Sequence, residues 1–94
     1  MPLFNPQQYP KVGVTPTGAI DGDNQVFTTP DYFINDGQTT IRVYYNGALQ
    51  REGGSYDYTL SESGGADTGW DTVTLEFTPF PGDTLTVDYW IRVG

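Results

Sequence analysis

Residues 84–93 read Thr-Leu-Thr-Val-Asp-Tyr-Trp-Ile-Arg-Val, and this stretch decides the fold. Apolar side chains occupy every second position from Leu85 to Val93, which is the period of a strand with one buried face. A helix collects its apolar side chains at intervals of three and four residues instead. The stretch therefore predicts a long β-strand whose apolar side forms part of a core.

Shorter stretches upstream show the same alternation and are separated by turn residues. The alternating apolar residues are Ile41, Val43 and Tyr45, then Tyr56, Tyr58 and Leu60, then Val73, Leu75 and Phe77. Asn46-Gly47 suits the positive φ angles of a two-residue type I′ hairpin, and Pro81-Gly82-Asp83 forms the turn before the last strand. About six to seven short strands with such turns predict an all-β fold, an antiparallel β-sandwich that is Ig-like or a flattened barrel.

Length and composition fit one domain with one core. The chain has 94 residues, and 7 Tyr, 5 Phe and 2 Trp supply much of its apolar surface, a composition that favours strands over helices. Because there is no cysteine, neither a disulfide nor a thiolate metal site stabilises the fold.

The first residues differ from the rest of the chain. Residues 1–17 contain four prolines and few charges, which favours extended backbone, so we predict an extended Pro-rich N-terminal arm (1–17) and a β-sandwich domain (18–94). Leu3, Phe4 and Tyr9 are apolar enough to dock on a neighbouring subunit, although a disordered leader is the alternative. If the strand over residues 84–93 lies at a sheet edge, it would pair with another chain or with this arm.

The charge excludes some partners. Twelve acidic and four basic residues, with no histidine, give a net charge of -8, which would repel a phosphate backbone. The charge favours solubility and would also complement a basic protein surface. No secretory signal or apolar run of about 20 residues is present, so we expect a soluble, complete protein made in the cytosol, with no nucleic-acid or membrane partner.

Catalytic chemistry has few candidate groups. Without His or Cys, nucleophilic triads and imidazole-rich metal sites are excluded, and the carboxylates of Asp57, Asp71, Glu76 and Asp88 fall at polar strand positions or in turns. Asp21 and Asp23 resemble the start of a calcium loop, but the closing Glu is missing. We therefore expect no enzyme activity, no cofactor and no metal.

Three aromatic residues fall where side chains point away from the expected core, namely Tyr44, Trp70 and Trp90. They have three possible roles: covering a sandwich edge or second face, contacting other subunits, or forming a platform for carbohydrate. Together with Leu3, Phe4 and Tyr9 they are the candidate partner-binding residues.

Four motifs carry a family resemblance: residues 18–28 (GAIDGDNQVFT), 43–49 (VYYNGAL), 56–60 (YDYTL) and 81–89 (PGDTLTVDY). They resemble a small β-sandwich module of tailed-phage virion proteins, found in capsid decoration or cement proteins, head fibres and tail or baseplate components. The resemblance covers residues 18–94 and implies structural roles for its motif residues, with Tyr56, Tyr58 and Tyr89 at packing positions.

The resemblance implies a non-enzymatic virion protein, made in the host cytoplasm and placed on the capsid surface. Because the module stands alone here, we expect a capsid cement or decoration protein, a homotrimer that clamps neighbouring subunits of the major capsid protein or binds another virion protein. The alternatives are a tail, baseplate or fibre component and, from a different class, a carbohydrate-binding module.

Overall fold

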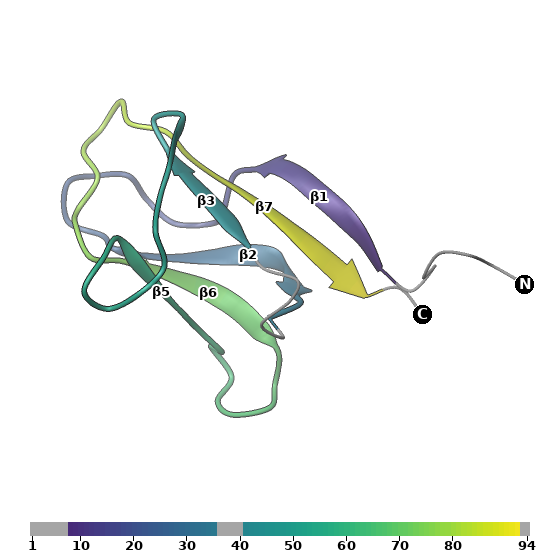
Figure 1. Cartoon of the computed structure of the whole chain (residues 1–94). Coiled ribbons are helices and arrows are strands. Elements are labelled where there is room, and N and C mark those ends of the chain that lie inside the picture. The colour runs from purple at the N-terminus through teal and green to yellow at the C-terminus, as the bar shows by residue number, and fades with distance from the viewer. Residues whose placement is uncertain (1–7, 36–40, 93–94) are drawn as a thin grey trace, which may run out of the picture.

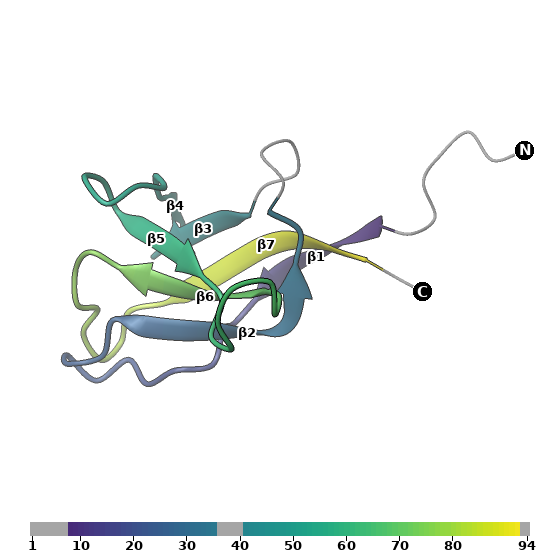
Figure 2. The same cartoon turned by 90° about the horizontal axis from the view of Figure 1, so that it is seen from below.

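The computed structural model describes residues 8–35 and 41–92, and its regular elements are all strands. The strands are β1 (Gln8–Val14), β2 (Val26–Phe33), β3 (Arg42–Tyr45), β4 (Ala48–Leu49), β5 (Tyr58–Ser61), β6 (Trp70–Leu75) and β7 (Leu85–Arg92). A larger sheet has the order β1-β7-β3-β4 and a smaller sheet the order β2-β6-β5, with antiparallel pairing throughout. The sheets form two layers (Figures 1 and 2), which confirms the predicted antiparallel β-sandwich.

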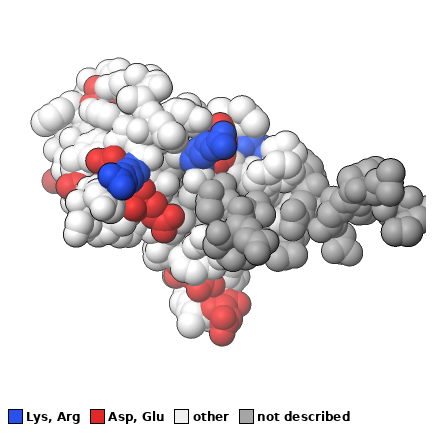
Figure 3. All heavy atoms as spheres, in the orientation of Figure 1, with Lys and Arg blue, Asp and Glu red and all other residues white. Residues whose placement is uncertain are grey.

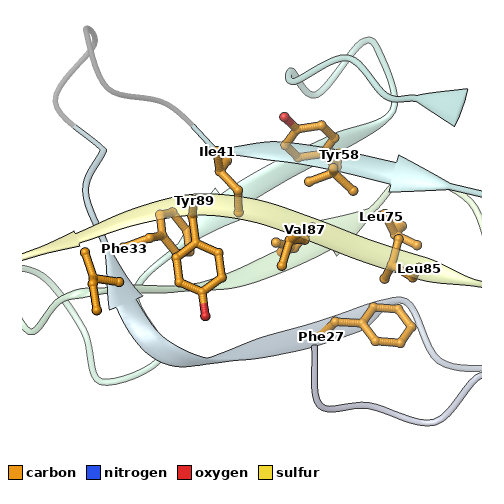
Figure 4. Packing of buried hydrophobic residues seen from close by; sticks show 11 residues of the cluster. Phe27, Phe33, Ile41, Tyr58, Leu75, Leu85, Val87 and Tyr89 are labelled. Atoms are coloured by element: carbon orange, nitrogen blue, oxygen red, sulfur yellow. The ribbon is translucent and has the colours of Figure 1, made fainter. Parts of the chain in front are cut away.

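The core lies between the two sheets and contains the alternating residues of β7. Leu85, Val87 and Tyr89 are each at most 2% exposed, as the two-residue period predicted. Burying a side chain of this size contributes about 1.5 to 3 kcal/mol relative to leaving it exposed. Figure 4 shows how the cluster packs, and its members are Phe27, Phe33, Ile41, Val43, Tyr58, Val73, Leu75, Leu85, Val87, Tyr89 and Ile91.

One predicted packing residue lies outside this core. Tyr56 is 51% exposed and precedes β5, which begins at Tyr58. The Arg51 guanidinium carbon lies 4.2 Å from the centre of the Tyr56 ring, and that ring packs against Gly53. The packing role implied for Tyr56 is therefore wrong, because the chain pairs regularly with β6 only from Tyr58 onward.

Part of the predicted arm belongs to the larger sheet. β1 pairs with β7 from Gln8, opposite Arg92, to Val14, opposite Val87, with a bulge between Lys11 and Val14. The sheet therefore starts within the segment that the sequence assigns to an arm. The long strand β7 therefore lies between β1, from the N-terminal part of the chain, and β3.

The strand β2 links the two sheets at one side of the sandwich. It pairs with β6 over Val26–Thr28, shifts register, and pairs again where Phe33 lies opposite Trp70. Just beyond β2, the N–H of Ile34 donates to the carbonyl of Trp90 at 2.9 Å, so the chain meets β7 of the larger sheet. Figure 2 shows β2 curving toward β7 at this end.

Candidate functional site

The side of the larger sheet that faces away from the core carries an exposed aromatic and aliphatic surface. In β3 and β7, Val43, Val87 and Tyr89 point inward, so the residues between them point outward. Cross-strand pairing places Tyr44 opposite both Thr86 and Leu49, Arg42 opposite Asp88, and Pro10 opposite Trp90. We call this surface the outer face, and it comprises Pro10, Val12, Arg42, Tyr44, Leu49, Thr86, Asp88 and Trp90.

Large apolar side chains of the outer face are open to solvent. Val12 is 73% exposed, Leu49 61% and Trp90 40%. The smaller sheet packs on the opposite side of the larger sheet, so no other described strand covers the outer face. Exposed apolar surface of this kind typically marks an interaction site when its members are adjacent.

The outer face carries little net charge on a strongly acidic chain. The described charged residues on it are Arg42 and Asp88, which have opposite sign and face each other across β3 and β7. Many of the acidic residues lie elsewhere, as in the loop between β5 and β6, where Figure 3 shows acidic side chains at the tip. A partner can therefore approach the outer face without strong repulsion from the chain's net charge of -8.

The structure places two of the three predicted aromatics on the same sheet face, with the Arg42–Asp88 pair between them. Tyr44 and Trp90 share the outer face, whereas Trp70 is in the smaller sheet and packs, partly buried, against the core. The prediction that Trp70 points away from the core is wrong, because the register shift in β2 places Trp70 opposite the buried Phe33.

The remaining candidate partner-binding residues come from the N-terminus. Leu3 and Phe4 lie outside the described residues, and the backbone of Tyr9 is opposite Ile91 in β1. β1 begins next to the end of β7, where Gln8 lies opposite Arg92 (Figure 1).

The free edge of β2 is closed to strand pairing. The Asn24 side chain bonds to both backbone groups of Val26, donating to the carbonyl at 2.8 Å and accepting from the N–H at 3.2 Å. Thr28 exchanges two backbone hydrogen bonds with Thr17, and Pro30 has no N–H to offer. The backbone groups along this part of β2 are therefore not available to pair with a strand from another chain.

The edges of β1 and β5 are blunted in similar ways. Pro10 lacks a donor, and in the bulge of β1 the N–H of Gly13 donates to the Asp88 carboxylate at 2.8 Å. At β5, Gly53 donates to the carbonyl of Tyr58 at 2.6 Å. These edges favour contact with partners through a sheet face rather than through strand addition.

The predicted turn residues form one connected cluster. Asn46 and Gly47 have φ angles of 51° and 82°, as a type I′ turn requires, and they connect β3 directly to β4. In the turn before β7, the Asp83 carboxylate accepts hydrogen bonds from the Tyr45 hydroxyl and from the N–H of Phe80. The bond from Tyr45 is the main reason that the pKa of the Asp83 carboxyl is lowered.

Two of the carboxylates considered for catalysis, those of Asp57 and Asp71, accept hydrogen bonds that hold loops in place. Asp57 accepts from the N–H of Arg51, and Asp71 accepts from both the N–H and the hydroxyl of Ser63. Burial raises the pKa of the Asp71 carboxyl, but the bonds from Ser63 and Thr72 outweigh it, so the net shift is downward.

The Asp21 carboxylate accepts hydrogen bonds from the N–H groups of Asp23 and Asn24 at 2.9 and 3.0 Å, and so closes a tight turn. In the part of the chain that the structure describes, no three acidic side chains gather as a metal site would require. Nor do residues 8–35 and 41–92 contain a helix that could cross a membrane.

Comparisons with known proteins identified no relative. A scan against protein-family models, a search of curated proteins and a search of solved structures each found no match. The resemblance to phage virion modules therefore stays a prediction from the sequence motifs.

Sequence reasoning did not place two of the large apolar side chains, those of Val12 and Leu49, on the outer face. Val12 lies in the segment interpreted as an arm, and Leu49 follows the hairpin turn. Counting outward from Asn46-Gly47 would have placed Leu49 opposite Tyr44, because a two-residue loop fixes the register. No sequence pattern connects Val12 to this surface, since its position depends on the pairing of β1 with β7.

Proposed function

We propose that the chain is a non-enzymatic structural protein of a tailed-phage virion, a capsid cement or decoration protein that docks on the major capsid protein. The outer face carries this proposal, because Tyr44, Trp90 and Leu49 lie on one sheet face that no other described strand covers. The motif resemblance supplies the virion setting.

Such docking needs only a fraction of the surface of the chain. A standard protein interface buries about 800 Å² on each partner, and the accessible surface here is 5847 Å². Aromatic side chains near the centre of an interface typically contribute most of its binding energy, which is the role we assign to Trp90 and Tyr44.

The N-terminal segment extends the proposed contact. Leu3 and Phe4 precede β1, an edge strand of the sheet that presents the outer face. We assign them to a neighbouring capsid subunit, so that one copy spans a subunit boundary and adds interface area there. The homotrimer that the resemblance implies would place such clamps around a local threefold axis.

Co-sedimentation with heads and, separately, with tails of the phage that encodes the chain tests this function. The full-length chain should bind heads saturably, and the double variant Tyr44→Ala, Trp90→Ala should bind at least tenfold more weakly while keeping its circular dichroism spectrum. Tyr56→Ala is the matched control, because Tyr56 is also exposed but lies outside the outer face.

A variant lacking residues 1–7 tests the clamp and leaves β1 intact. It should bind heads more weakly than the full-length chain. Binding to tails alone would replace the proposal with a tail, baseplate or fibre role, and binding to neither particle would remove the virion function.

A further inference from the structure

A polar hollow opens where β2 shifts register. Its volume is about 490 Å³, within the range of about 300 to 1,000 Å³ that is usual for ligand sites, and it is lined by Thr29, Pro30, Asp31, Tyr32, Asp71 and Ile91. The Thr29 hydroxyl donates to the carbonyl of Asp31 at 2.5 Å, which holds the bulge in shape. Bulges of this kind often direct side chains into functional sites.

An exposed aromatic ring borders the hollow. Tyr32 is 62% exposed, yet its ring packs against the backbone of Gly69. A Cβ built on Gly69 would lie 2.6 Å from the ring, so a larger residue would displace Tyr32. The ring thus presents a supported apolar face beside polar groups, an arrangement suited to stacking against a flat ligand.

A carboxylate and an ammonium group lie beside the ring. The Asp31 Oδ2 accepts a hydrogen bond from the Tyr89 hydroxyl at 2.9 Å and lies 3.8 Å from the Lys11 ammonium. Asp31 lines the hollow, and a carboxylate accepts several hydrogen bonds, so it can accept from a ligand beside these contacts. Burial, followed by the bond to Asp31, raises the pKa of the Tyr89 hydroxyl, which keeps it a donor.

We propose that this hollow binds a saccharide, with one sugar face on the Tyr32 ring and hydroxyl groups donating to Asp31. Sugars present both an apolar C–H face and donors, and the hollow offers a matching ring and acceptor. A basic side chain fits less well, because Lys11 already lies next to the Asp31 carboxylate and would repel a second cation. This site differs from the outer face, since none of its lining residues belongs to that surface.

Titration followed by amide NMR tests the proposal on the full chain. The probes are D-glucose, D-galactose, L-rhamnose and N-acetyl-D-glucosamine at millimolar concentrations, together with a glycan array. At least one probe should shift the amides of Asp31, Tyr32 and Gly69 saturably. Tyr32→Ala should weaken binding by about tenfold, and Asp31→Asn should also weaken it.

Two further variants separate this site from other surfaces. Gly69→Ala should weaken sugar binding although Tyr32 is retained, whereas Trp90→Ala should leave it unchanged. Sugar binding that survives Tyr32→Ala, or no glycan bound in either assay, overturns the proposal. Shifts of the same amides by lysine amide but by no sugar would make the hollow a cation site and overturn it as well.

Discussion

The side-chain oxygen of Asn46 accepts a hydrogen bond from the backbone N–H of Thr84 at 2.7 Å, which joins two turns that lie 38 residues apart. The backbone N–H of Asn46 donates in return to the carbonyl of Thr84 at 2.9 Å. The Asn46 side-chain amide also donates to Asp83, and the same carboxylate accepts from the Tyr45 hydroxyl. The hairpin turn and the start of β7 are therefore held as one unit.

Two substitutions of Asn46 separate the contribution of its side-chain hydrogen bonds from that of its positive φ angle. Asn46→Gly keeps the positive φ but removes the side-chain hydrogen bonds, so we expect a loss of about 1 to 2 kcal/mol in the free energy of unfolding. Asn46→Ala should cost about 1 kcal/mol more, since alanine disfavours positive φ. Urea unfolding measures both. Wild-type stability in Asn46→Gly would show that the link between the turns does not stabilise the fold.

Gly47→Val tests the turn itself. At Gly47, φ is 82° and no atom lies within 4 Å of a built Cβ, so any cost comes from the backbone rather than from a clash. A β-branched residue disfavours this conformation, and we expect a loss of at least about 1 kcal/mol. Unchanged stability in urea unfolding would argue against a strict type I′ requirement.

Short sequence patterns predicted much of this fold, but they could not predict contacts between segments that are distant in the sequence. The alternation from Leu85 to Ile91 and the Asn46-Gly47 dipeptide depend on neighbouring residues, and both match the structure, while Val93 lies outside the described residues. The link from Asn46 to Thr84 depends on the register of β3 against β7, which no local pattern encodes. The pairing of β1 with β7 is non-local in the same way. The sequence analysis could use only the prolines of this segment, and it therefore predicted an extended arm rather than a strand of the sheet.

The candidate sites also combine features that local patterns predict with features that depend on strand pairing. Alternation placed Tyr44 and Trp90 away from the core, but only the pairing of β3 with β7 puts them on one face. Trp70 was misassigned because its environment depends on the bulge in β2. The hollow beside Tyr32 was missed for a related reason, since its walls come from β2, β6 and β7.

Gly18 lies against the core, and a methyl group there should be costly. A Cβ at Gly18 would be 2.5 Å from the ring of Phe27, which is 1% exposed and cannot move freely. We expect Gly18→Ala to lower the free energy of unfolding by about 1 to 3 kcal/mol. Gly54→Ala is the matched control, because no atom lies within 4 Å of its built Cβ, and should stay within about 0.5 kcal/mol of wild type. Equal effects in thermal melts would contradict this packing role.

Asn24 protects the edge of β2, and its loss should affect both stability and association. Asn24→Ala leaves the N–H and carbonyl of Val26 without their side-chain partner, which should cost about 1 kcal/mol. The opened edge should also promote self-association, visible as a concentration-dependent rise in sedimentation coefficient. Asn24→Asp keeps the acceptor but not the donor and should give an intermediate result. A monomeric Asn24→Ala of wild-type stability would mean that the edge needs no such protection.

Alkaline pH should destabilise the sandwich through its buried tyrosines. Burial, with smaller contributions from Glu52 and Asp57, raises the pKa of Tyr58 to about 12, whereas an unfolded tyrosine titrates near pH 10. Below pH 10 both states keep the proton, so the contribution is constant. Between pH 10 and about 12 the unfolded chain releases a proton that the folded chain retains, so stability falls as pH rises.

The expected loss from Tyr58 over this range is on the order of 2 to 3 kcal/mol. Tyr89, whose pKa is also raised by burial and by Asp31, should add to it. Urea unfolding at successive pH values measures the slope, and Tyr58→Phe should flatten it because the titrating hydroxyl is gone. Tyr56→Phe removes an exposed hydroxyl instead and should keep the wild-type slope. A slope that Tyr58→Phe leaves unchanged would place the alkaline sensitivity elsewhere in the chain.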